Sequence, residues 1–402
     1  MAGKRILITT GDAGFGHRSA AEAIAAALAE RHGGEVEVFN PMDDDRVPKA
    51  LREGQHAYDD VVQDLPRLYK MAYDSSDATV PASVLDVALT VALFGVVRDR
   101  LRNYDPDAVV TTFPLFPAVI GAVRTIEGGQ TPLITVVTDL TETHRIWYSQ
   151  ASDLTVVPTG EARQVALDHG LAADRVEVIG IPVDPAFAGE RRAPAAIRGE
   201  LGWDPDLTTL LVVGSRRVRD MGGFLRMLNH AGLPLQLAIV AGGDDALYAE
   251  LQEIEWHGPT HTYNFVENMP ALMRASDLIL CKAGGLIVTE ALACGLPLLL
   301  IDVLPGQEEG NAEYVVEHGA GELAEKPMDA LAILYHWLED DGQLLAERAG
   351  NARQIGRPQA AYEIAERVWH ADEELASAEA DQAEERSKLS ELLSRYDVPW
   401  QS

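Results

Sequence analysis

The sequence predicts an α/β protein with two doubly wound parallel sheets. Its 402 residues are too many for one hydrophobic core, so two domains are expected. In each half, continuous apolar runs of strand length alternate with helical segments, as in a parallel sheet buried on both faces. Glycines follow the first strand and one strand of the second half, which is typical of a helix that begins close to a strand end.

The first domain is expected over residues 1–185, and a helical insertion at about residues 43–102 interrupts its alternation of strands and helices. Its predicted strands cover residues 5–10, 36–40, 108–112, 133–138, 154–158 and 176–180. A charged, proline-bearing stretch up to residue 205 is typical of an interdomain linker.

The second domain is expected over residues 186–355, followed by helices and an acidic tail at 356–402. Its predicted strands cover residues 209–214, 235–240, 262–265, 278–281 and 298–301. After residue 322 only helices are predicted. The two domains would face each other across a cleft.

Charge and cysteine usage limit the function classes. A formal net charge of −30 should repel nucleic acid and anionic membrane surfaces alike. The two cysteines, Cys281 and Cys294, lie in apolar segments, which fits a reducing compartment. Neither a signal sequence nor a run of transmembrane length is visible. We therefore expect a cytoplasmic protein, or one peripheral on the inner face of the cell membrane.

The apolar stretch at residues 84–97 allows two interpretations. It is closed by Arg98, Arg100 and Arg102, so it could lie on a membrane with its basic end at the headgroups. It could equally pack on the first domain, because a predicted strand follows closely.

His17 is a candidate general base in the first half. It starts a helix just after Gly16, at the carboxyl end of the first strand. A helix N-terminus disfavours an imidazolium, so His17 should be neutral and able to accept a proton. The alternative is a capping residue.

A second polar cluster follows the predicted strand at 133–138. It contains Asp139, His144 and Trp147, which could orient an acceptor or support His17. Loop structure, with Asp139 capping the next turn, is the alternative.

Residues 282–311 look like a site for a nucleotide diphosphate. Gly284 and Gly285 would let the backbone approach phosphates, and the following helix presents free N–H groups to negative charge. Glu290 could hold a ribose diol. A polar loop with Gln307, Glu308 and Asn311 could bind a sugar. Close packing of helix on strand would also explain the glycine pair alone.

Two further strand ends could contact the same ligand. Ser215 and Arg216 begin an arginine-rich loop that could neutralise a diphosphate, or point to solvent. The segment with Val266 and Met269 could offer backbone groups to a base edge. No metal site is predicted, and nicotinamide or ATP motifs are lacking.

Together these motifs resemble the two-domain GT-B glycosyltransferases, and more narrowly the monogalactosyldiacylglycerol synthase and diacylglycerol glucosyltransferase group. The peptidoglycan N-acetylglucosaminyl transferase is a relative of that group. The matching stretches run in family order and cover residues 14–22, 68–71, 135–147, 265–269, 282–291 and 305–311. The chain departs from the usual glycine-rich runs at residues 14–16 and 215–219.

The resemblance implies inverting transfer of a hexose, galactose ahead of glucose, from a UDP-sugar to diacylglycerol at a membrane surface, with no metal or cofactor. His17 and Asp139 would be catalytic. The implied donor-binding residues are Gly16, Ser215, Arg216, Val266, Met269, Gly284, Gly285, Glu290, Gln307, Glu308 and Asn311. The implied acceptor-binding residues are His144, Trp147 and Tyr69. Alternatives are another lipid or soluble acceptor, and a non-catalytic module that binds UDP-sugar.

Overall fold

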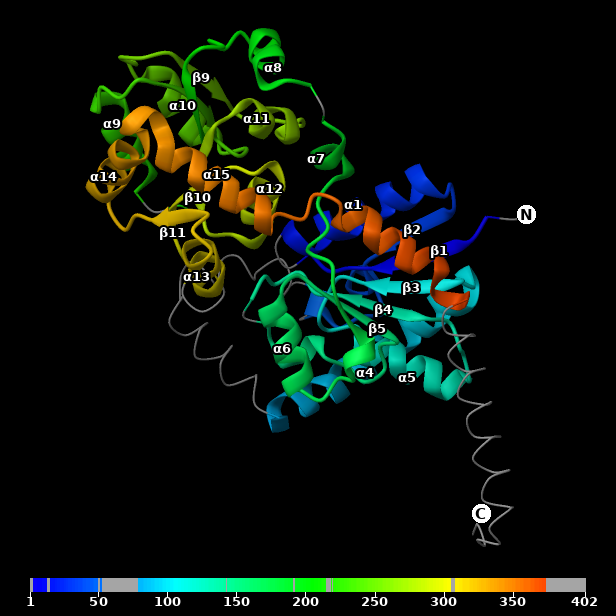
Figure 1. Ribbon diagram of the computed structural model, residues 1–402. Coiled ribbons are helices and arrows are strands. Elements are labelled where there is room, and N and C mark those ends of the chain that lie inside the picture. The colour runs from blue at the N-terminus through cyan, green and yellow to red at the C-terminus, as the bar shows by residue number, and fades with distance from the viewer. Residues whose placement is uncertain are drawn as a thin grey trace, which may run out of the picture.

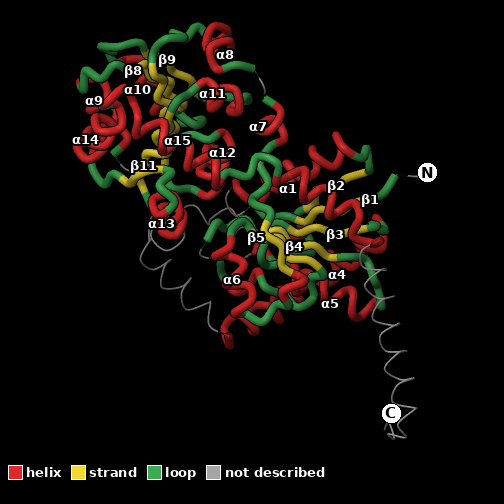
Figure 2. The backbone as a smooth tube through the Cα atoms, in the orientation of Figure 1, coloured by secondary structure: helices red, strands yellow, loops and turns green. Residues whose placement is uncertain are grey.

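Two six-stranded parallel sheets form the framework of the chain (Figures 1 and 2). The structure is a computed structural model, and it describes residues 3–12, 15–49, 51–52, 79–141, 143–190, 192–214, 218, 220–304 and 308–373. The first sheet has the order β2-β1-β3-β4-β5-β6 and the second the order β12-β11-β10-β7-β8-β9. The predicted α/β architecture with two doubly wound sheets is confirmed.

All six strands predicted for the first sheet are present. They are β1 (Arg5–Thr9), β2 (Glu35–Phe39), β3 (Ala108–Thr111), β4 (Leu133–Val136), β5 (Leu154–Val157) and β6 (Val176–Val178). Its helices are α1 (Phe15–Arg31), α4 (Thr79–Tyr104), α5 (Pro117–Glu127) and α6 (Gly160–Asp168), with 3-10 turns η1 (Pro41–Asp43), η2 (Arg145–Trp147) and η3 (Ala173–Arg175). Successive side chains along each strand point to opposite faces of the sheet. Ile6 and Ile8 pack under α1, whereas Val109 packs under α4 and α5.

The second sheet has the five predicted strands and one more. They are β7 (Thr208–Val213), β8 (Leu235–Val240), β9 (Thr260–Tyr263), β10 (Leu278–Lys282), β11 (Leu298–Asp302) and β12 (Gly321–Leu323). The prediction of helices alone after residue 322 was wrong at β12. This strand has only three residues, too few to show a β pattern, and pairing with β11 defines it.

Helices cover both faces of the second sheet. They are α7 (Pro185–Gly189), α8 (Pro194–Leu201), α9 (Met221–His230), α10 (Asp245–Glu253), α11 (Met269–Ala275), α12 (Gly285–Cys294), α13 (Glu309–Glu317), α14 (Pro327–Leu338) and α15 (Gln343–Ile355), with the turn η4 (Asp340–Gly342). Ile279 and Leu300 face one core layer, and Leu278 and Leu299 face the other.

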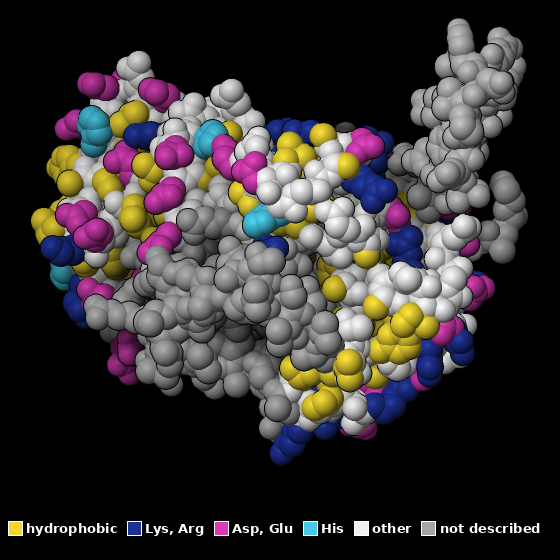
Figure 3. All heavy atoms as spheres, turned by 90° about the horizontal axis from the view of Figure 1, so that it is seen from below, with side chains coloured by type: hydrophobic (Ala, Val, Ile, Leu, Met, Phe, Trp, Pro, Cys, Tyr) yellow, Lys and Arg dark blue, Asp and Glu magenta, His cyan; other side chains and the backbone are white. Residues whose placement is uncertain are grey.

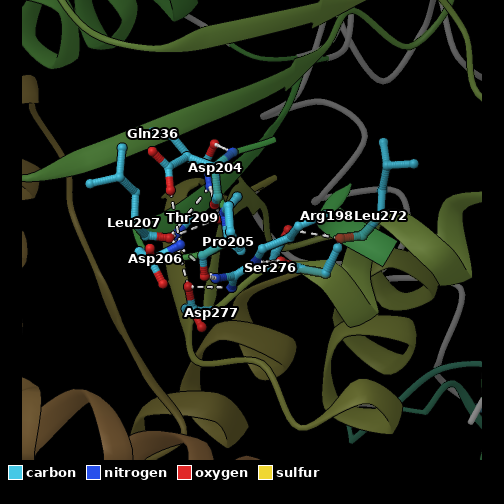
Figure 4. A network of polar contacts seen from close by, with 11 residues as sticks. Arg198, Asp204, Pro205, Asp206, Leu207, Thr209, Gln236, Leu272, Ser276 and Asp277 are labelled. Atoms are coloured by element: carbon cyan, nitrogen blue, oxygen red, sulfur yellow. Dashed lines mark hydrogen bonds and ion pairs between the residues drawn. The ribbon is translucent and has the colours of Figure 1, made fainter. Parts of the chain in front are cut away.

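Part of the predicted linker docks firmly on the second sheet (Figure 4). Arg198 on α8 is buried, and its guanidinium donates to the carbonyl oxygens of Ala275, Pro205 and Leu207. It also pairs with Asp277 at 2.7 Å, and the same carboxylate oxygen accepts from the N–H of Thr209. This satisfied network fixes α8 to the amino ends of the strands, so these residues are part of the second sheet's unit.

The chain returns to the first sheet after α15. A helix over residues 360–373 runs beside α1 (Figure 1), and Ile364 and Val368 share the core of Ile6 and Ile24. The Tyr362 hydroxyl donates to Glu30 at 2.6 Å. The sequence predicts helices in residues 356–402 but not this partner, because only the fold brings the helix to α1.

Within α4, the described side chains favour packing on the first domain. Leu93, Val96 and Val97 are buried against Val109, whereas Val91 is 78% exposed. The side chains of residues 79–89 lie outside the described residues. Helix α4 therefore covers the sheet through its C-terminal half.

The basic end of α4 is paired with acidic side chains. Arg98, Arg100 and Arg102 form ion pairs. Their partners are Asp99, Glu37 and Glu127, respectively. The positive charge of this basic end is therefore neutralised at the three arginines. Figure 3 shows acidic and basic side chains interspersed on the face that it views. Within the described ranges, no helix meets the length and hydropathy needed to cross a membrane.

Candidate active site

His17 lies where the strand order of the first sheet reverses, between β1 and β3. It belongs to the first turn of α1, just past the carboxyl end of β1. The Thr112 hydroxyl, just past β3, donates to the His17 carbonyl oxygen at 2.9 Å, and its oxygen lies 3.0 Å from Thr10 Oγ1. Such a switch point is where open α/β sheets bind ligands.

The His17 imidazole has three close neighbours. Its Nδ1 lies 2.7 Å from Thr138 Oγ1, and its ring meets Phe113 edge-on at 5.0 Å and Trp147 at 5.9 Å between centroids. Burial lowers the pKa of His17, and the negative charge of Asp139 partly opposes that shift. A neutral imidazole in this setting can take up a proton.

Asp139 is held in place by Trp147. The indole Nε1–H of Trp147 donates to Asp139 Oδ2 at 2.7 Å. Trp147 is fully buried, so it contacts His17 and Asp139 from within the domain. His144 is also buried, and its Nδ1 accepts from the N–H of Ile146 to cap η2. The acceptor-binding roles of His144 and Trp147 stay predictions.

The glycine pair lies at the corresponding place in the second sheet, between β10 and β7. Gly284 is the N-cap of α12, and because it has no side chain, no side-chain cap accepts hydrogen bonds from the first N–H groups of the helix. Asn311 is buried and donates from Nδ2 to the Ala283 carbonyl oxygen at 2.9 Å, which braces the loop. A Cβ on Gly285 would lie 3.7 Å from the Thr138 carbonyl oxygen. The two halves therefore meet at this point.

Glu290 occupies the second turn of α12. Burial, with a smaller contribution from Asp184, raises its pKa to about 8. Its carboxyl group makes no hydrogen bond to any residue that the structure describes. It is a desolvated polar group available to a ligand.

Glu308 is buried, and both of its carboxylate oxygens are occupied. Lys282 Nζ pairs with Oε1, and the Leu304 N–H donates to Oε2 at 3.0 Å. The site thus contains a cation, Lys282, to which the sequence interpretation assigned no role.

Comparison with known proteins identifies the family. The monogalactosyldiacylglycerol (MGDG) synthase family matches residues 17–183, and the glycosyltransferase family 28 C-terminal domain matches residues 210–339. A probable chloroplastic monogalactosyldiacylglycerol synthase of Glycine max is 31% identical over 373 residues, covering 90% of this chain and 70% of the relative. The chain belongs to the monogalactosyldiacylglycerol synthase family. It is therefore an enzyme of the glycosyltransferase class.

A second relative supports that assignment, and a solved structure has a similar fold. The chloroplastic monogalactosyldiacylglycerol synthase of Spinacia oleracea is 31% identical over 374 residues, covering 90% of this chain and 71% of the relative. Acinetobacter baumannii MurG superposes with a TM-score of 0.60 at 15% identity, covering 91% of this chain and 99% of MurG. This structural likeness confirms the GT-B fold predicted by the resemblance.

Three of the remaining predicted residues, Gly16, Val266 and Met269, belong to the described ranges. Val266, in the loop after β9, and Met269, the first residue of α11, are partly buried, and Phe265 is 71% exposed beside Gly243. A Cβ on Gly16 would meet no atom of the described residues within 4 Å. Tyr69, Ser215, Arg216 and Gln307 lie outside the described residues. No group of three metal-ligating side chains occurs among the residues that the structure describes.

Three contacts of the site were missed from the sequence. Thr138 bonds His17, Phe113 packs on it, and Lys282 pairs with Glu308. Thr138 and Lys282 both end or follow predicted strands, so their position was a usable signal. The partner of each residue could not be predicted from the sequence, because each contact joins residues far apart in the chain.

Proposed function

We propose that this family member transfers galactose from UDP-galactose to diacylglycerol, with inversion at the anomeric carbon and without a metal ion. The names of the relatives support galactose and diacylglycerol. The observation that carries the mechanism is the half-buried His17, bonded through Nδ1 to Thr138 and lying in the half opposite the glycine loop.

His17 acts as the general base. When Nδ1–H is donated to Thr138 Oγ1, Nε2 keeps its lone pair and accepts the proton of the acceptor hydroxyl. The acceptor oxygen attacks the anomeric carbon as the bond from that carbon to UDP breaks on the opposite side. The negative charge of Asp139, oriented by Trp147, stabilises the imidazolium that forms.

The second half binds the donor and its leaving group. The free N–H groups at the start of α12, beside Gly284 and Gly285, stabilise the diphosphate as it departs. Glu290 binds the ribose. The backbone at Val266 and Met269 binds the edge of the uracil, and Glu308 binds a sugar hydroxyl. We assign contacts with the diphosphate to Ser215 and Arg216, and contacts with the sugar to Gln307 and Asn311. Gly16 leaves room for the donor at α1.

A diacylglycerol acceptor requires the enzyme to work at a membrane surface. We assign this peripheral contact to the first half, where Tyr69 and residues 43–102 are located. The rival acceptors are another lipid and a small soluble alcohol. Glucose is the rival sugar.

UDP release over a panel of UDP-sugars, with and without diacylglycerol vesicles, tests this function. We expect turnover with UDP-galactose that depends on the vesicles. Equal turnover with a soluble alcohol would favour the rival acceptor. UDP binding with no transfer to any acceptor would favour a non-catalytic module.

A further inference from the structure

The ion pair between Lys282 and Glu308 lies directly beside the glycine loop. Lys282 ends β10, and the pairing of β10 with β11 shifts register between Cys281 and Lys282. The shift leaves Ile301 of β11 without a partner on β10, and Lys282 is paired with Asp302 just after it. The Lys282 side chain reaches Glu308 and is only 15% exposed, while that of Glu308 is 8% exposed.

The pair adjoins the space in which a diphosphate would lie. A Cβ on Gly284 would be 3.6 Å from Glu308 Oε1 and 3.7 Å from Lys282 Cε. An anion at the start of α12 would thus meet the carboxylate of Glu308 at short range. In a chain with a net charge of −30, a cation is needed at that position to offset the repulsion.

Lys282 is suited to contact both groups. Its ammonium has three N–H donors, of which the bond to Glu308 uses one. The Leu304 N–H holds the other oxygen of Glu308, so the carboxylate is fixed and the ammonium is held beside Gly284.

Resting on the donor site proposed above, we propose that Lys282 is a further donor-binding residue. Its ammonium contacts the diphosphate of the UDP-sugar while holding Glu308 against the sugar. The Lys282 side chain then links recognition of the diphosphate to recognition of the sugar.

Calorimetric titration of the whole chain with uridine and with UDP tests this role. Lys282→Met should weaken UDP binding about 10- to 100-fold, as for a lost charge-assisted hydrogen bond, and change uridine binding less than about twofold. Lys282→Arg keeps the charge and should retain most UDP affinity. Glu308→Gln should bind UDP at least as tightly as the wild type, because it removes the repelling carboxylate.

Lys326→Met is the matched control, since Lys326 is an exposed lysine at the start of α14 in the same half. It should bind UDP as the wild type does. If Lys282→Met fails to fold, Lys282→Met/Glu308→Gln removes both buried charges, and we expect it to fold and to bind UDP, but not uridine, more weakly than Glu308→Gln does. Wild-type UDP affinity in a folded Lys282→Met chain, or equal loss of uridine and UDP, would overturn the proposal.

The outcome is separable from that of the proposed function. These titrations contain no acceptor and no transfer step. A wild-type chain that binds no UDP would remove the proposed function itself. A wild-type chain that binds UDP, with unchanged binding in Lys282→Met, would remove only the role of Lys282.

Discussion

The two halves share one architecture but place different chemistry at the same position. Each sheet is six-stranded, parallel and doubly wound, and each has polar residues where its strand order reverses. In the first half that position holds an imidazole whose pKa burial lowers. In the second it holds a glycine-capped helix, a carboxyl group whose pKa rises to about 8, and a buried Lys–Glu pair. The shared framework sets where a site forms, and local residues decide what it does.

This difference divides the reaction between the halves. The first half should control turnover, because its groups act on a proton. The second half should control donor affinity, because its groups contact the nucleotide before any bond changes. Substitutions that separate transfer rate from UDP affinity therefore test the division directly.

The largest effect is expected for His17→Ala. Loss of the general base should lower kcat by about 10²–10⁴-fold and leave UDP affinity within about twofold of the wild type. Transfer assays and calorimetry measure the two quantities. His336→Ala, at an exposed position on α14, is the control. Unchanged turnover in His17→Ala would remove His17 from the mechanism.

Glu290→Ala should show the opposite pattern. Removing a desolvated carboxyl that holds the ribose should weaken UDP by about 1–3 kcal/mol. The binding of uridine should weaken as much as that of UDP, since both ligands carry the ribose. This equal loss of affinity distinguishes Glu290→Ala from Lys282→Met. Calorimetry that finds UDP affinity unaltered would count against the ribose role.

Thr138→Val should have a smaller effect on the first half alone. It keeps the shape of the side chain but removes the hydroxyl that bonds His17 Nδ1, so kcat should fall about 10-fold while the KM for UDP-sugar stays similar. Thr138→Ser restores the hydroxyl and should recover most of the rate. A Ser variant as slow as the Val variant would point to lost packing instead.

The smallest effect is expected from Asp139→Asn, and it is best seen in the pH profile. Asp139 raises the pKa of His17 against the larger effect of burial, so its neutralisation should lower that pKa further. His17 must be neutral to accept a proton, so the acid limb of kcat/KM should move to lower pH, with a modest fall in the plateau rate. An acid limb that moved to higher pH would contradict this arrangement.

Much of the fold could be predicted from the sequence because strand and helix signals are local. Among the described residues, eleven predicted strands correspond to β1–β11, and the three-residue β12 was missed. Single site residues such as His17, Gly284 and Glu290 could also be found, because they stand directly after apolar runs. The roles assigned to Tyr69, Ser215, Arg216 and Gln307 stay predictions, since these residues lie outside the described ranges.

The two parallel sheets and the strand ends at which polar residues gather follow from local sequence patterns, because hydrophobic periodicity and glycine placement act over a few residues. Which of those residues meet depends on how the strands are arranged in three dimensions. Thr138 bonds His17 across 121 positions, and its carbonyl oxygen approaches Gly285 in the other half. Trp147 turns inward to hold Asp139, and Lys282 pairs with Glu308 where β10 and β11 shift register. Such contacts depend on strand order and side-chain direction, which no local pattern specifies.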